Sequence, residues 1–437
     1  MTATTRAGAV LPDGPRTPRF VQAVSFAVAR RGTMRRLRRR YGSAFTVESL
    51  NLGRLVMLAD PAEVRELFQT GPALADTTAT NLGSVLGPGS LFAITDDEHR
   101  RQRKLLTPPF HGRHLRRYES IIEEETARET ASWPAGQPFP VLPSTMRITL
   151  NVILRAVFGA EGADLDELRT LLPAAVRLGS VLAVLPVLNR ELGGHGPGAR
   201  FRRYRRRYDE IIDQLIDRAT ADPHLAGRDD VLALLVQARY DDGSGLSRGQ
   251  IADQLLTLLT AGHETTATTL AWAVERLRRH PAVLDRLAAG DDDLLDATLV
   301  EVQRVRPVIE LTARQVRAEA LRIGRWTLPR GTVVAAGIAL LHEDETLFPD
   351  PERFDPGRFA GARADTYGWI PFGGGVRRCI GAAFASLEMR VVLRTVLRDF
   401  TLEPTTDPAE RSHSRGIAVA PARGGLAVVH RRHGRDG

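Results

Sequence analysis

Cysteine, lysine and long apolar runs are scarce in this chain. Its 437 residues contain one cysteine, Cys379, so no intrachain disulfide can form, and the thiol is inert, reactive or a metal ligand. Lys104 is the only lysine among 60 basic residues, and the net charge is +8. Arginine is therefore the ordinary surface cation of this protein.

The longest apolar stretch near the N-terminus is too short for a membrane anchor. A helix that spans a bilayer needs roughly 20 consecutive apolar residues. Residues 20–29 are about half that length and include Gln22 and Ser25. The N-terminus also lacks the charged, apolar and small-residue segments of a secretory signal. We expect a cytoplasmic protein without a membrane anchor.

The densest run of arginines lies within residues 34–40. Such a run would suit nucleic acid or anionic lipid, but it is equally typical of the solvated face of a short helix. Because arginine elsewhere alternates with Asp and Glu, we favour the second interpretation and expect no nucleic-acid partner.

The pattern along the chain predicts a mainly α protein with a small β region. Residues 1–19 are rich in Pro, Gly and Arg, which favours a flexible arm. Apolar segments at 44–47 and 55–58 predict a hairpin, and a helix is expected from Pro61. Residues 96–290 are mainly helical in pattern, and strands return at 321–323, 332–334 and 427–429. The β region should therefore combine both ends of the chain.

The single cysteine lies in a glycine-rich loop, residues 372–381, just before a helical pattern that runs to about Phe400. At a helix N-terminus, backbone N–H groups and the helix dipole favour a thiolate, which is the form that a soft metal ligand needs. A buried cysteine in an ordinary glycine turn is the simpler alternative. A cysteine with two glycines would leave that alternative open, but all ten consecutive residues of this loop carry information, which weighs against it.

Residues 261–266 interrupt a core helix with polar side chains. The helix is predicted to begin with a capping box of Ser247 and Gln250. Within it, Thr265 can donate a hydrogen bond to the carbonyl of Ala261, which bends a helix and leaves room for water. By itself this pattern is equally consistent with a kinked, buried helix.

Two further residue pairs are uninformative alone and become informative only through their order along the chain. Glu301 and Arg304 are three residues apart on a predicted helix, a common and weak pairing. They precede Arg353 in a Pro-Glu-Arg-Phe segment. Earlier, His99 and Arg103 lie four residues apart in a basic helix at 96–104.

In this order the four segments resemble the cytochrome P450 family. The family's haem-binding loop is matched in full by Phe372, Gly375, Arg377, Cys379 and Gly381. Its oxygen-activation motif, a small residue, Gly, any residue, an acid and Thr, is matched by residues 261–265. The resemblance covers essentially the whole chain and implies one haem domain over residues 20–437. It also implies haem b (iron protoporphyrin IX), with Cys379 as the axial ligand of the iron.

The resemblance also implies roles for individual residues. Glu264 would relay protons while Thr265 orients bound dioxygen. Glu301, Arg304 and Arg353 would form a buried structural network behind the haem. The residues expected to contact the cofactor are Cys379, His99, Arg103, Arg314, Arg377, Phe372, Gly373, Gly381 and Ala261.

The substrate pocket is expected to include Ala261, Ile309, Glu310 and Leu311, with the loop from Leu82 to Ile94 covering it. Glu310 departs from the family, which commonly has an apolar residue or proline there. It either anchors a basic substrate or points into a surface network, and the second interpretation is slightly favoured.

The implied activity is oxidation, most simply hydroxylation, of a lipophilic small molecule in secondary metabolism. It uses O₂ and electrons from a separate ferredoxin and ferredoxin reductase, and we expect a monomer. Arg100, Arg101, Lys104 and Arg378 are candidates for a positive docking patch. Epoxidation or coupling of aromatic rings, a haem-binding sensor or carrier, and a basic nucleic-acid-binding protein are the alternatives. The intact Glu264–Thr265 pair argues against a sensor or carrier.

Overall fold

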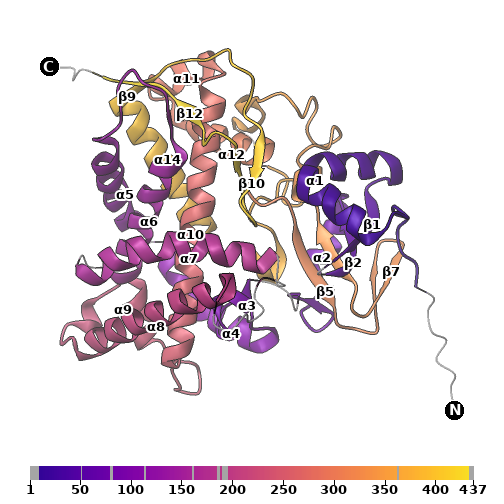
Figure 1. Ribbon diagram of the computed structural model, residues 1–437, viewed down its shortest axis with the longest axis horizontal. Coiled ribbons are helices and arrows are strands. Elements are labelled where there is room, and N and C mark those ends of the chain that lie inside the picture. The colour runs from indigo at the N-terminus through magenta and orange to yellow at the C-terminus, as the bar shows by residue number, and fades with distance from the viewer. Residues whose placement is uncertain are drawn as a thin grey trace.

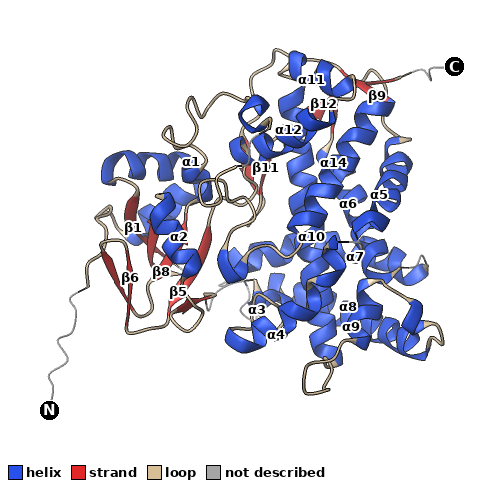
Figure 2. Ribbon diagram, turned by 180° about the vertical axis from the view of Figure 1, so that it is seen from behind, coloured by secondary structure: helices blue, strands red, loops and turns tan. Residues whose placement is uncertain are grey.

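The computed structural model describes residues 9–50, 52–78, 82–112, 115–159, 162–184, 188, 195–361 and 364–432. A large helical body lies beside a smaller region of strands that carries α1 (Arg19–Tyr41) and α2 (Pro61–Gln69) (Figure 1). Seen from behind, α10 (Arg248–Leu277) runs through the middle of the helical body (Figure 2). The predicted fold class, mainly α with a small β region, is confirmed.

The remaining helices are α3 (Gly83–Leu86), α4 (Asp96–Leu106), α5 (Leu115–Thr130), α6 (Leu142–Phe158), α7 (Ala163–Val184), α8 (Pro197–Ala221), α9 (Val231–Gln237), α11 (Pro281–Ala288), α12 (Asp292–Val305), α13 (Ile338–Leu341) and α14 (Ala382–Asp399). Short 3₁₀ turns include η5 (Pro356–Phe359) and η6 (Gly375–Arg377).

The strands are β1 (Ala44–Ser49), β2 (Gly53–Leu58), β3 (Ala75–Asp76), β4 (Phe139–Pro140), β5 (Thr312–Val316), β6 (Ala320–Ile323), β7 (Trp326–Pro329), β8 (Val333–Ala336), β9 (Phe400–Leu402), β10 (Ser412–Ser414), β11 (Val419–Pro421), β12 (Leu426–Ala427) and β13 (Val429–Arg431).

The main sheet joins strands from the N-terminal part of the chain to β5 and β8, with the strand order β1-β2-β8-β5-β3. The strands predicted at 321–323 and 427–429 lie outside it, in the two-stranded pairs that the other strands form. The predicted hairpin is present, with Ala44 opposite Leu58. β2 then pairs in parallel with β8, which brings residues 55–58 beside 333–336. Because β5 pairs with β8 in turn, this long-range pairing fixes the position of Arg314 in β5.

The predicted capping box begins α10. The Ser247 hydroxyl accepts from the Gln250 N–H at 3.2 Å, and the Gln250 side chain accepts from the Ser247 N–H at 2.9 Å. These bonds satisfy two N–H groups that a helix start otherwise leaves unpaired. Most of the helix is buried, with Leu255, Leu259 and Leu277 fully inside.

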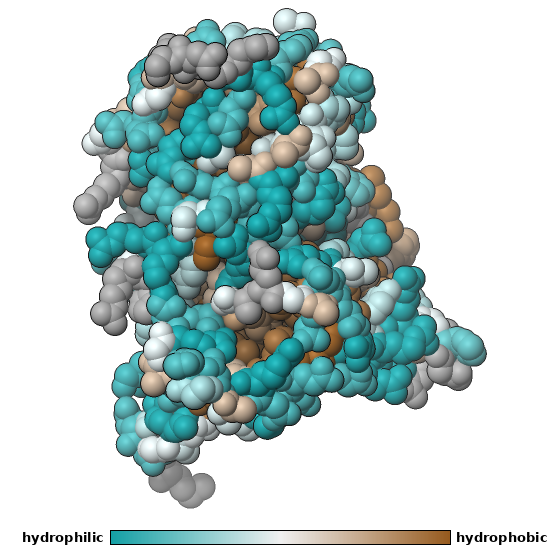
Figure 3. All heavy atoms as spheres, turned by 90° about the vertical axis from the view of Figure 1, so that its left-hand side faces the viewer, coloured by the Kyte–Doolittle hydropathy of each residue, from teal (hydrophilic) through white to brown (hydrophobic). Residues whose placement is uncertain are grey.

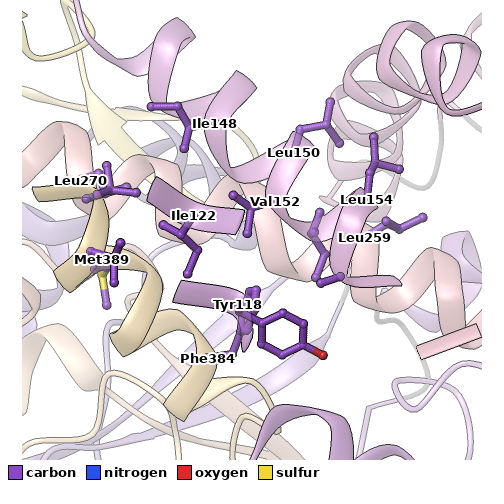
Figure 4. Close-up of a cluster of buried hydrophobic side chains, with 14 of the residues drawn as sticks. Tyr118, Ile122, Ile148, Leu150, Val152, Leu154, Leu259, Leu270, Phe384 and Met389 are labelled. Carbon is purple, nitrogen blue, oxygen red and sulfur yellow. The ribbon is translucent and has the colours of Figure 1, made fainter. Parts of the chain in front are cut away.

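The main core takes side chains from most helices of the helical body, and Figure 4 shows the part of it where α5, α6, α10 and α14 meet. Ile122 of α5 and Val152 of α6 are fully buried, together with Leu259 of α10. Phe384 of α14 makes an edge-to-face contact with Tyr118 of α5 at 5.1 Å between ring centroids. This packing holds α14, and with it the cysteine loop, against the long helix.

The arm expected over residues 1–19 is only partly described. Residues 1–8 lie outside the described residues. Val10 pairs with Thr327, and the Asp13 carbonyl accepts from the Thr46 N–H at 3.0 Å. The described part of this segment is therefore hydrogen-bonded to the β region, because its backbone groups find partners there.

Polar and charged residues cover most of the face seen in Figure 3, and apolar residues are visible within a hollow. In the part of the chain that the structure describes, no helix is long and apolar enough to cross a membrane.

A buried ion pair within α12 anchors the segment that follows α13. Glu301 and Arg304 are both 0% exposed, and two hydrogen bonds of 2.6 and 2.7 Å join their side chains. Arg304 also donates to the backbone carbonyls of His342, Pro351 and Arg353. One guanidinium therefore fixes three points of a long connection that has little regular structure of its own.

The expected role of the Arg353 side chain is wrong. It is 67% exposed and lies 3.7 Å from Asp355. Arg304 contacts only its backbone carbonyl. The second arginine near Glu301 is Arg358, at 3.7 Å and largely buried. The chain turns at residues 350–355, and this turn directs Arg353 outward.

We predict that Arg304→Ala lowers the free energy of unfolding by about 3–5 kcal/mol, because it leaves the Glu301 carboxylate buried without its partner. Arg353→Ala, the matched control, should change it by no more than about 0.5 kcal/mol. Urea unfolding followed by circular dichroism measures both. Equal losses for the two variants would contradict this assignment.

Candidate cofactor and active site

The loop before α14 holds Cys379 in a closed turn. The Cys379 N–H donates to the Phe372 carbonyl at 2.9 Å, and Gly373 and Gly375 have φ values of +64° and +63°. Glycine adopts that left-handed conformation without steric cost. Gly381 then caps α14, and the cysteine side chain is exposed although the loop lies against the core.

Two glycines of the loop allow it to pack closely against α2. A Cβ at Gly374 would lie 2.1 Å from the Phe68 ring, and a Cβ at Gly375 would lie 2.2 Å from the Phe68 carbonyl oxygen. In contrast, a Cβ at Gly381 meets no atom within 4 Å. Contact of Gly373 and Gly381 with the cofactor remains a prediction.

The surface of Cys379 is accessible, but the protein packed around its sulfur displaces water and so raises the pKa of the thiol. The Gly381 N–H, Arg103 and Arg378 act in the opposite direction. The sequence predicted that the helix start would favour the thiolate, but these groups do not outweigh the desolvation. A coordinated metal ion ionises a thiol directly. The donor is a single soft sulfur at an accessible position, which fits the axial ligand of a haem iron.

Two basic side chains of α4 lie near the cysteine without a protein partner. Burial, with Arg377 and Arg103 nearby, lowers the pKa of His99 to about 4. Burial also lowers the pKa of Arg103, which the Cys379 sulfur partly offsets. Among the described residues, neither side chain makes a hydrogen bond or ion pair. Buried donors of this kind normally have an acceptor.

Two further arginines join this cluster from other parts of the chain. Burial, with Arg377 nearby, lowers the pKa of Arg314 in β5 to about 10. Arg377 donates to Asp76 at 2.8 Å and to the Leu91 carbonyl at 2.6 Å. Asp76 is also near His99 and Arg314. Arg314, Arg377 and His99 thus share one buried carboxylate and Arg103 has none, which fits a cofactor with negatively charged groups.

On α10 the side chains of the motif are more accessible than their surroundings. Ala261 is exposed and Thr265 half-buried, within a helix whose neighbouring turns are buried. The Thr265 hydroxyl donates to the Ala261 carbonyl at 2.9 Å, as predicted. Small and polar side chains at this point leave space beside the helix.

The acid of the motif has a partner that the sequence did not reveal. Glu264 is largely buried, and its Oε1 accepts from Nε of Arg415 at 2.9 Å. Arg415 follows β10, 151 residues further along the chain. No spacing pattern could have found this contact, because it depends on how the C-terminal hairpin folds back onto α10.

A largely apolar cavity lies between α3, α7, α8 and α10. Its lining is Leu82, Val85, Leu86, Leu171, Leu172, Ala175, Val176, Gly179, Ser180, Phe201, Tyr204, Arg205, Tyr208, Leu256 and Thr260. Leu82 belongs to the loop expected to cover the pocket. Arg205 is the only charged group in the lining, and it pairs with Asp209 and Asp253.

The residues predicted after Arg304 do not line this cavity. Glu310 is buried and its carboxylate lies 3.7 Å from Arg30 of α1. Burial raises the pKa of Glu310, and Arg30 partly offsets this. The partner is therefore internal, which corrects the idea of a substrate anchor. Leu311 packs on the α1 side, while Ile309 lies between two core clusters.

An accessible thiol before a helix, buried cations and an acid–alcohol pair on the long helix define a haem-thiolate protein. The chain belongs to the cytochrome P450 family, whose model matches residues 12–428. Members of this family are oxygen-incorporating monooxygenases, and the cofactor is haem b.

Relatives and solved structures agree with this assignment. The chain is 53% identical to a Mycobacterium tuberculosis protein named cytochrome P450 138 over 426 residues, which cover 97% of each chain. It is 42% identical to cytochrome P450 135B1 of the same species over 427 residues, which cover 95% of this chain and 90% of that one. The retinoic acid-bound cyanobacterial CYP120A1 has the same fold, with a TM-score of 0.86 at 23% identity over 97% and 100% of the two chains.

We predict that Arg103→Ala and Arg314→Ala each weaken haem retention at least about tenfold, since a hydrogen bond to a charged group contributes about 1.5–3 kcal/mol. Transfer of haem to an excess of apomyoglobin measures the loss. Arg322→Ala, an exposed arginine of β6, is the control. If all three variants release haem at the wild-type rate, the cations do not bind the cofactor.

Proposed function

We propose that this P450 hydroxylates a neutral, lipophilic small molecule, using O₂ and electrons from a separate carrier. The observation that carries the proposal is the acid–alcohol pair, Glu264 and Thr265, on α10 next to an accessible Ala261. The same helix supplies Leu256 and Thr260 to the apolar cavity. The same helix would thus contact the substrate and carry the two residues that deliver protons.

When bound, the haem supplies the metal at which O₂ is activated, with electron density donated by the thiolate. The protein's own residues then manage protons. Glu264 is largely buried but close to the surface through Arg415, so it is placed to take protons from water. Thr265, held by the Ala261 carbonyl, presents a hydroxyl that can accept and donate at this point of the helix.

The cavity supports a neutral, apolar substrate. Its lining is dominated by Leu, Val, Ala and aromatic side chains. The Arg205 guanidinium already has two carboxylate partners, Asp209 and Asp253, and donates to the Leu86 carbonyl at 2.8 Å. An acidic substrate would therefore find no free cation there, and most of its affinity would come from apolar area removed from water.

The test is turnover by the purified haem-loaded protein. Compounds that shift the iron from low to high spin would be incubated with NADPH, O₂, a ferredoxin and its reductase. We expect one oxygen atom from ¹⁸O₂ in the product. Cys379→Ala should lose both the red-shifted Soret band of the reduced CO complex and turnover.

In the same assay, Glu264→Gln and Thr265→Ala should lower product formation about 100-fold or more while leaving the CO spectrum unchanged, since proton transfer by a positioned side chain contributes roughly 10²- to 10⁴-fold in rate. Haem binding without product for any spin-shifting compound would favour a sensor or carrier instead.

We further propose that the electron carrier is an acidic ferredoxin that docks near α4 and the Cys379 loop. Two of the four basic residues expected in the docking patch already pair with carboxylates of this chain. Arg101 pairs with Asp242 and Lys104 with Asp241, whereas Arg100 has only Asp97 on its own helix. Arg378 is exposed. Arg100 and Arg378 are therefore the stronger candidates.

We predict that Arg100→Glu slows reduction by an acidic ferredoxin roughly tenfold at low salt, and that the difference disappears at high salt because charges are screened. Stopped-flow formation of the reduced CO complex measures the rate. Arg322→Glu, the same change in β6, should have no effect. Salt-insensitive reduction of the wild type would contradict the proposed docking.

A further inference from the structure

The acid of α10 depends on a cation from the far end of the chain. Arg415 lies at the turn between β10 and β11, and its Nε is 2.9 Å from Oε1 of Glu264. The Arg415 side chain is 30% exposed and the Glu264 side chain 10%. In the described part of the chain neither residue has a second ion-pair partner. The partly exposed Arg415 side chain therefore lies between solvent and the largely buried Glu264 of α10.

The other titratable neighbour of Glu264 does not replace this cation. His263 is completely buried, and its Nδ1 is 2.8 Å from the Leu259 carbonyl. Burial lowers the pKa of His263, which favours the neutral ring. The positive charge that faces the Glu264 carboxylate is therefore the Arg415 guanidinium.

The turn that carries Arg415 also contacts the substrate side of the molecule. Gly416 has a φ of +102°, and a Cβ there would lie 3.0 Å from the Ser180 Cβ and 3.2 Å from its carbonyl oxygen. Ser180 belongs to α7 and lines the apolar cavity. Adjacent residues of one tight turn thus contact the cavity wall and the acid of α10.

We propose that Arg415 is a positioning residue for proton delivery, and that its turn links the position of α7 to the orientation of the Glu264 carboxylate. The inference rests on the proposed hydroxylation. With substrate in the cavity, α7 and Gly416 hold the turn in place, and the 2.9 Å hydrogen bond from Arg415 keeps the Glu264 carboxylate directed toward the solvent edge. A shift of α7 would move the turn and loosen this contact.

The step is a transfer of protons without electrons. A hydronium ion at the exposed edge of Arg415 gives its proton to Glu264 and becomes water. The protonated carboxyl then gives that proton to the Thr265 oxygen, whose own proton moves on to the dioxygen that is being reduced, and Glu264 returns to the carboxylate that pairs with Arg415. Arg415 donates hydrogen bonds throughout and transfers no proton.

The first experiment follows where the electrons of NADPH go. In Arg415→Gln the share recovered as product should fall at least threefold, with a matching rise in hydrogen peroxide, because the largely buried Glu264 side chain loses the hydrogen bond that orients it. Arg415→Lys, which keeps the charge, should recover part of the loss. Arg411→Gln, at an exposed position just before β10, should behave as wild type.

Gly416→Ala tests the link to α7 without changing a charge. The added Cβ would press on Ser180 and strain the backbone, so the turn should move and the yield should fall as in Arg415→Gln. Gly243→Ala is the control, since its φ is +82° and a Cβ there meets no atom within 4 Å. Equal yields for Gly416→Ala and Gly243→Ala would overturn the link.

A measurement that needs no turnover checks the pair itself. The melting temperatures of the haem-loaded wild type, Glu264→Gln, Arg415→Gln and the double variant form a cycle. We expect the two single shifts not to add, since the residues are in contact. If the shifts add, or if the wild type is active and Arg415→Gln gives the same yield, the inference about Arg415 is wrong and the proposed hydroxylation stands. A wild type without any product refutes the proposed hydroxylation instead.

Discussion

Buried positive charge is the constraint on which the site depends. Arg103 of α4, Arg314 of β5 and Arg377 of the cysteine loop converge beside the neutral His99, and Asp76 is close to Arg314 and Arg377. Burying cations without counter-charge costs several kcal/mol per ion. Bound haem would supply the missing negative charge, and cofactor binding would then stabilise the fold of these three segments. The sheet order matters for chemistry because it brings β5 to this cluster.

Local patterns were sufficient for the elements and for the reacting residues. Ser247 and Gln250 predicted the start of α10 because a capping box involves only neighbouring residues. The Thr265 back-bond was predictable for the same reason. The ten residues around Cys379 identified the loop because the geometry of a cysteine before a helix is encoded within that loop. Each of these features depends on residues a few positions apart.

Features that depend on residues far apart in the chain were missed. Arg353 and Arg358 both follow the Pro-Glu-Arg-Phe segment, and only the path of the chain decides which one faces Glu301. Gly374 and Gly375 are required by Phe68, roughly 300 residues earlier. Glu310 meets Arg30 because β5 lies beside α1. In each case the residue type was informative, but its partner depends on tertiary packing.

The residues expected to hold the cofactor and the residues that line the cavity come from largely different segments. This separation explains why the sequence identifies the chemistry but not the substrate. The cations and the thiol come from α4, β5 and the cysteine loop, whereas the cavity is lined by α3, α7, α8 and α10. Substitutions at Val176 or Phe201 can reshape the cavity without touching the cofactor's ligands. The β10–β11 turn lies against the cavity wall at Ser180 and pairs with Glu264 of α10. The segment from Leu82 to Ile94 lines the cavity at one end, and its Leu91 and Ile94 carbonyls accept from Arg377 at the other. Both segments can therefore couple the substrate side of the molecule to the oxygen chemistry.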